Sequence, residues 1–122
     1  MLARRRFLAR GLGLAAAARL SDIADLGRGG VILFSVDQPT GGVRNITSAA
    51  QLSALTSALA AASRVPLIVA IDQEGGQVAR LGPSHGFPAT PSAAEMGRGA
   101  PADTEAVARS MALTERGVGV TL

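Results

Sequence analysis

Two short apolar runs predict β-strands in the middle of the chain. The first is Val31–Ser35, and the second is Leu67–Ile71, five consecutive aliphatic residues that end abruptly at Asp72. An uninterrupted aliphatic run is typical of a parallel strand whose two faces are both covered. We therefore expect the strand to leave the core at the aspartate.

Helical patterns follow each of these strands. Ser48 with Gln51 three positions later fits a capping box, and Pro66 ends the helix that this box begins. The buried stripe of that helix is expected to consist of Leu52, Leu55, Leu59 and Ala62. A second helix is predicted over Asp103–Arg116, and Val118–Leu122 begins a third strand. The order strand, helix, strand, helix, strand favours an α/β fold of βαβ units with parallel strands.

Composition limits the kind of core and the kind of partner. The chain has 122 residues, 48% of them hydrophobic but only 2% aromatic, so one domain with a small-grained aliphatic core is expected. Five of the twelve basic residues lie in the first nineteen positions, which hold no acid, so the net charge of +3 belongs to this leader. Stacking aromatics are nearly absent, and we expect no nucleic-acid partner. The chain has no cysteine, which excludes disulfides and thiolate sites.

The Arg-rich leader, residues 1–22, has two interpretations. Arg4-Arg5-Arg6 followed by a short mildly apolar stretch resembles a twin-arginine export signal. The alternative is an amphipathic helix with apolar residues spaced three to four apart. The first interpretation predicts export to the periplasm or beyond, and the second a cytoplasmic protein. The apolar stretch is too short to span a membrane, so no integral membrane segment is expected.

The end of the second strand is the candidate binding site, because ligands of parallel α/β folds bind at the carboxyl ends of the strands. Asp72 lies there, Gly75 and Gly76 allow an unusual backbone path, and Arg80 follows within reach of bound hydroxyls. The alternative is an internal ion pair of Arg80 with Asp72 or Glu74 that only holds the loop.

The stretch that carries these residues, Asp-Gln-Glu-Gly-Gly-x-Val-x-Arg, resembles the N-terminal domain of family 3 glycoside hydrolases. The likeness is to the bacterial β-N-acetylhexosaminidase branch, and it covers roughly residues 23–122. The resemblance implies a partial (β/α)8 TIM-type barrel and a retaining mechanism through a covalent glycosyl intermediate. It implies that Asp72 and Arg80 bind sugar hydroxyls, while Glu74, Gly75 and Gly76 shape the loop. Gln77 stands where the family often has an arginine.

No catalytic residue is expected in this chain. The family's nucleophilic aspartate and its histidine loop have no counterpart here, and His85 lies in the wrong place for that loop. We therefore interpret the chain as a fragment, inactive by itself, of an enzyme that removes terminal β-linked N-acetylglucosamine from a carbohydrate substrate. The alternatives are a β-glucosidase specificity and a non-catalytic sugar-binding or inert remnant. No motif predicts a metal site or another cofactor.

Overall fold

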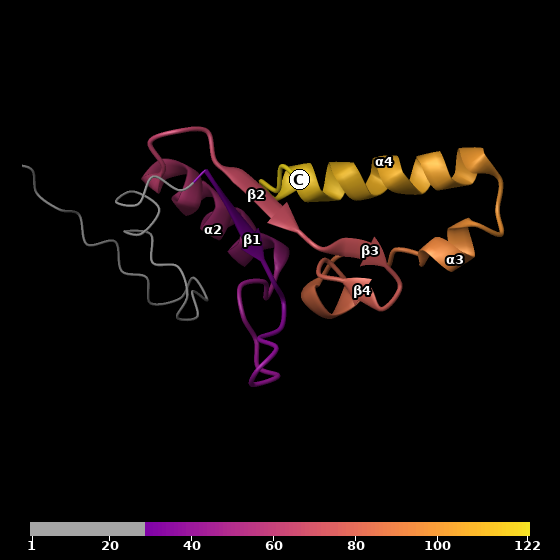
Figure 1. The fold of residues 1–122 in the computed structure, drawn as a ribbon, viewed down its shortest axis with the longest axis horizontal. Helices are drawn as coiled ribbons and strands as arrows, with labels where there is room; N and C mark the ends of the chain where they lie inside the picture. Colours follow the sequence, from indigo (N-terminus) through magenta and orange to yellow (C-terminus); the bar gives the residue numbers. More distant parts are fainter. Residues whose placement is uncertain (1–28) are drawn as a thin grey trace, which may run out of the picture.

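The computed structural model describes residues 29–122. The predicted leader, with its export-signal and helix interpretations, lies outside the described residues, and so do residues 23–28. Figure 1 shows the order of the elements. They are β1 (Gly30–Leu33), α2 (Ala49–Ala62), β2 (Ile68–Ile71), β3 (Gln73–Gly75), β4 (Val78–Ala79), the 3-10 turn η1 (Pro83–His85), α3 (Ala93–Met96) and α4 (Pro101–Gly117).

The centre of the fold is one βαβ unit. Strands β1 and β2 pair in parallel, from Gly30 opposite Ile68 to Leu33 opposite Ile71, and α2 forms the crossover between them. Ser48 caps α2 by accepting a hydrogen bond from the Gln51 N–H. The prediction of an α/β chain with parallel strands is confirmed. Closure of these strands into a barrel stays a prediction, since the described residues contain only this two-stranded parallel sheet and a short antiparallel hairpin.

The core lies between α2 and one face of the β1–β2 sheet. Leu52, Leu55 and Leu59 of the predicted stripe are buried, and they belong to one cluster with Leu33 and Val69. Ala62, the fourth predicted member, is only half-buried, because it is the last residue of the helix. Leucine and valine side chains thus supply the apolar area that stabilises the unit.

The opposite face of the sheet is open within the described residues. Ile32 is 61% exposed and Ile68 is 52% exposed, although both belong to aliphatic strands. The expectation that both faces of the second strand are covered is therefore wrong for residues 29–122. An aliphatic run reports that a strand is suited to burial, and another part of the structure has to provide the cover.

The predicted third strand is not formed as a strand. Gly119 has a positive φ of 79°, and this turn brings the chain beside β2 only at its last two residues. There the Leu122 N–H donates to Val69 O, and the Ile71 N–H donates to Leu122 O, both at 3.1 Å. This is the hydrogen-bond pattern of a parallel ladder. The segment is anchored by the buried side chains of Val118 and Val120.

The second predicted helix is confirmed as α4, which is slightly longer than expected. Pro101 occupies its first turn, where a proline needs no hydrogen-bond donor, and the Asp103 carboxylate accepts from the Ala100 N–H at 3.2 Å. No residue of α4 is buried. Among the residues described, none of the helices is both long enough and apolar enough to span a membrane.

Candidate functional site

The strand β2 presents Asp72 at its carboxyl end. The hairpin β3–β4 then reverses the chain and returns Arg80 to the aspartate, where Arg80 Nη2 donates to Asp72 Oδ2 at 3.1 Å. The Arg80 side chain is 18% exposed, and that of Asp72 is 43% exposed. The pair that the sequence singled out is thus assembled, with its cation mostly covered and its carboxylate open to solvent.

The ion-pair alternative also exists in this geometry for Asp72, and not for Glu74. Glu74 is exposed and has no ion pair within the described part of the chain. An aspartate that binds a sugar and an aspartate that only anchors the loop would both be expected to pair with Arg80. The ion pair alone therefore fits either role. The accessibility of Asp72 and its response to mutation distinguish the two roles.

An aromatic ring from the first strand lies beside this pair. Phe34 follows β1 directly, and Arg80 Cζ lies 5.6 Å from the centroid of its ring. Arg44 Cζ lies 5.5 Å from the same centroid. Both distances fall in the range of cation–π attraction. Our sequence analysis missed Phe34 and Arg44; the signal available was a rare aromatic residue at the carboxyl end of a predicted strand.

The loop that contains Arg44 is a small hairpin. Val36 and Val43 form an antiparallel bridge, and the Asp37 N–H donates to Gly42 O at 2.8 Å. Arg44 Nη1 lies 3.6 Å from Asp37 Oδ1, so a second aspartate–arginine pair stands at the same edge of the sheet. The parallel arrangement of β1 and β2 brings both pairs together.

The glycines of the second loop are required by close packing. Gly75 and Gly76 have φ values of 81° and 60°, a region that residues with a side chain adopt at a cost. A Cβ on Gly75 would collide with the carbonyl oxygen of Pro91, and one on Gly76 would lie 2.7 Å from Ser92 Cβ. The Gly76 N–H also donates to Thr90 O at 2.9 Å. The segment of residues 82–92, here called the Pro-rich segment, therefore supports the turn between Asp72 and Arg80.

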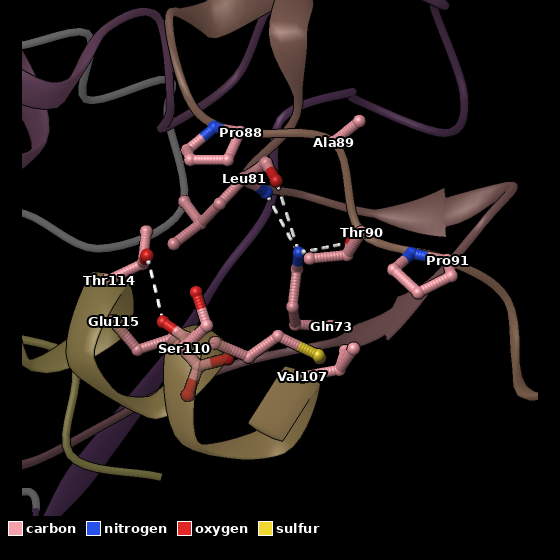
Figure 2. Close-up of a pocket in the computed structure, with 11 residues that line it drawn as sticks. Gln73, Leu81, Pro88, Ala89, Thr90, Pro91, Val107, Ser110, Thr114 and Glu115 are labelled. Carbon is pink, nitrogen blue, oxygen red and sulfur yellow. Dashed lines mark hydrogen bonds between the residues drawn. The ribbon is translucent and has the colours of Figure 1, made fainter. Parts of the chain in front are cut away.

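A cavity of about 100 Å³ lies behind this loop, between the Pro-rich segment and α4. Figure 2 shows Gln73 and Leu81 on one side of it and α4 on the other. Its lining includes Glu115, whose pKa is raised by partial burial. Asp72 and Arg80 are not among the lining residues, so the cavity adjoins the candidate site without forming it.

The remaining polar groups offer little further chemistry. In the described segment, no three Asp, Glu or His side chains are grouped as metal ligands. His85 is half-buried, and its Nδ1 lies 3.2 Å from Ser84 Oγ. Arg80 Nε is buried and has no hydrogen-bond partner among residues 29–122. The open carboxylate of Asp72 and the guanidinium of Arg80 are therefore kept as the candidate site.

The chain is similar to bacterial beta-hexosaminidases over part of its length. It is 44% identical to the beta-hexosaminidase of Bordetella pertussis over 70 residues, which are 57% of this chain and 17% of that protein. It is 53% identical to the beta-hexosaminidase of Alkalilimnicola ehrlichii over 53 residues, which are 43% of this chain and 13% of that protein. Beta-hexosaminidase A of Pseudoalteromonas piscicida is 45% identical over 58 residues, 43% of this chain and 8% of that protein.

These likenesses confirm the resemblance to β-N-acetylhexosaminidases that the sequence predicted. The matched stretch spans less than a fifth of the length of each of these three relatives. No protein-family model matches the chain.

Proposed function

We propose that this chain supplies the sugar-binding edge of a family 3 glycoside hydrolase that removes terminal β-linked N-acetylglucosamine. Asp72 accepts hydrogen bonds from sugar hydroxyls at the cleavage position, and Arg80 donates to an adjacent hydroxyl while orienting the carboxylate. The nucleophile and the acid/base lie outside residues 29–122, so the catalytic residues of the reaction are not in this part of the chain.

The observation that carries the proposal is the Asp72–Arg80 pair at the carboxyl end of a parallel strand. One oxygen of Asp72 is bonded to Arg80, and its other oxygen has no hydrogen-bond partner in the described residues. A carboxylate can accept from two neighbouring hydroxyls, and a guanidinium has five donors in a fixed fork. Arg80 uses one of these donors on Asp72, which leaves others for a ligand.

The open face of the sheet supports the (β/α)8 barrel that the family resemblance implies, which is part of this proposal. In a (β/α)8 barrel the helices cover the outside of the strands, and side chains from the strands fill the interior. Here α2 covers one face of β1 and β2, while Ile32 and Ile68 project from the other face and remain exposed. Aliphatic side chains at these positions are suited to a barrel interior that further strands would complete.

The substrate follows from the similarity and from the site together. The three relatives described above are named as hexosaminidases, which favours an N-acetylhexosaminide over a β-glucoside. A retaining glycosidase of this kind works with a nucleophile and an acid/base on either side of the scissile bond. Asp72 and Arg80 would bind neighbouring hydroxyls of the sugar ring and contribute binding energy in the transition state.

A chimera tests the proposal. Residues 29–122 replace the corresponding segment of the Bordetella pertussis beta-hexosaminidase, and hydrolysis of chromogenic β-N-acetylglucosaminide and β-glucoside is measured. We expect the chimera to hydrolyse the β-N-acetylglucosaminide, since the host supplies the catalytic residues and residues 29–122 supply Asp72 and Arg80 to bind the sugar hydroxyls. Asp72→Asn should lower kcat/KM for both substrates at an unchanged melting temperature.

Two results would contradict the proposal. A folded chimera without hydrolysis would favour the inert-remnant alternative. A folded Asp72→Asn chimera with undiminished kcat/KM but a lower melting temperature would identify the carboxylate as a loop anchor only.

A further inference from the structure

We infer that Gln73 is a positioning residue that sets the distance between Asp72 and Arg80. The inference rests on the proposed function, because these two residues are its sugar-binding pair. It concerns a side chain whose hydrogen bonds go to Leu81 and Thr90 and to neither the carboxylate of Asp72 nor the guanidinium of Arg80.

The backbone pairing of the hairpin β3–β4 ends before it includes Asp72 and Arg80. Gln73 is opposite Ala79, and the register is irregular between Gln73 and Gly75. Beyond Ala79, the side chain of Gln73 takes over the pairing. The Leu81 N–H donates to Gln73 Oε1 at 2.9 Å, and Gln73 Nε2 donates to Leu81 O at 3.1 Å.

The glutamine amide thus acts like one more peptide group in the ladder. Leu81 is only 1% exposed, so its backbone N–H and C=O need partners inside the protein. A primary amide offers both a donor and an acceptor, and neither a carboxylate nor an apolar side chain of the same length does so. We call the two hydrogen bonds between the Gln73 side chain and the Leu81 backbone the clamp. Asp72 immediately precedes Gln73, and Arg80 immediately precedes Leu81. The clamp therefore fixes the positions of the Asp72 and Arg80 backbones, from which the two side chains extend.

The second hydrogen of the amide connects the clamp to the Pro-rich segment. Gln73 Nε2 lies 3.3 Å from Thr90 Oγ1, and Figure 2 shows the amide of Gln73 facing both Leu81 and Thr90. Thr90 also accepts from the Gly76 N–H through its carbonyl oxygen. One side chain therefore joins both ends of the loop to its support.

The test uses nuclear magnetic resonance on the full 122-residue chain to measure how well the hydrogens beside the pair are protected from solvent. Solvent exchange is followed for the Leu81 amide, for the buried Nε–H of Arg80, and for the core amides of Val69 and Leu55. Gln73→Met keeps the length of the side chain and removes its donors and acceptor. Gln77→Met makes the same change at an exposed glutamine of the same loop and is the matched control.

We expect Gln73→Met to raise exchange at Leu81 and at Arg80 Nε about 10-fold or more, with Val69 and Leu55 unchanged. Gln77→Met should change none of the four. Unchanged exchange at Leu81 and Arg80 in Gln73→Met would overturn the inference. A uniform rise at all four sites would also overturn it, because Gln73 would then support the fold in general.

A second variant covers the case in which Gln73→Met does not fold. Gln73→Glu keeps an acceptor for the Leu81 N–H and loses the donors to Leu81 O and Thr90. It should leave the Leu81 amide protected while exchange at Arg80 Nε rises. If this variant also fails to fold, Gln73 is a folding residue and the inference is wrong. None of these readouts depends on hydrolysis, so an inactive chimera and a failed clamp remain separate results.

Discussion

The two loops at the carboxyl edge of the β1–β2 sheet each carry an aspartate–arginine pair, but they are held in different ways. In the first loop, Asp37 and Arg44 join the two ends of a hairpin whose tip is exposed, and their charged atoms are 3.6 Å apart. In the second, Asp72 and Arg80 are 3.1 Å apart, and the loop between them is packed against the Pro-rich segment.

The two pairs differ in whether the aspartate carboxylate still has an oxygen available to bind a ligand. Asp37 is bonded to the Thr40 hydroxyl as well as paired with Arg44, so its carboxylate is occupied within its own hairpin. Asp72 is bonded only to Arg80 in the described residues, and the loop around it is constrained by glycines and by Gln73. A partly exposed ion pair contributes little to stability, whereas a rigid loop with an open carboxylate is suited to binding. The first pair therefore serves as an internal control for the second.

The largest expected difference between the loops concerns the two aspartates, each replaced singly by alanine in the chimera. Hydrogen bonds to charged groups contribute roughly 1.5–3 kcal/mol each, and Asp72 can accept two from a sugar. Asp72→Ala should lower kcat/KM about 10²- to 10⁴-fold. Asp37→Ala should change it less than about 3-fold, because that carboxylate is already bonded to Thr40 and Arg44. Equal losses in steady-state kinetics would break the comparison between the two loops.

The next effect concerns stability and uses one glycine from each loop. Gly75→Ala combines left-handed strain with a collision against Pro91, and should lower the free energy of unfolding by about 2–5 kcal/mol. Gly41 has a φ of 69° but open space around it, so Gly41→Ala should cost only about 1–2 kcal/mol. Urea denaturation of the 122-residue chain measures both values. Similar costs would mean that the second loop is not packed as the structure shows.

A smaller effect on kinetics is expected for the two arginines. Arg80→Ala removes about one charge-assisted hydrogen bond to the sugar, and kcat/KM of the chimera should fall about 10- to 10²-fold. Arg44→Ala removes the other guanidinium beside Phe34 and should leave kcat/KM within about 3-fold. A larger loss for Arg44→Ala than for Arg80→Ala would place the ligand at the first loop.

The smallest expected effect concerns the residues that support the second loop, at the start of α3. Ser92, which packs against Gly76, also caps α3 and donates to the Glu95 carboxylate from its N–H and its hydroxyl, both at 2.7 Å. These hydrogen bonds lower the pKa of Glu95 below its ordinary value of 4.5. A lowered pKa stabilises the folded state above that value, and the gain disappears as the pH falls through the folded-state pKa.

Glu95→Gln should therefore melt at a slightly lower temperature than the unchanged chain at pH 7. The difference in melting temperature should close as the pH is lowered progressively below 4.5. A difference that stays constant over this range would show that the charge of Glu95 does not contribute to the cap.

The sequence by itself determined the helix α2 and the strand β2, and it predicted the candidate site at the end of β2. Hydrophobic spacing and the capping pair Ser48–Gln51 predicted α2, and the aliphatic run ending at Asp72 predicted β2, because these signals depend on residues close together in the chain. The motif around Asp72 and Arg80 also pointed to the resemblance that the comparisons confirmed.

Only the tertiary structure decided how the site is supported. The ring of Phe34 reaches Arg80 because β1 and β2 are neighbours, and the side chain of Gln73 replaces a backbone pair because Leu81 is buried beside it. The open face of Ile32 and Ile68 likewise depends on which elements pack against the sheet. These contacts join residues that are distant in sequence, and their energies depend on burial and geometry that no local pattern contains.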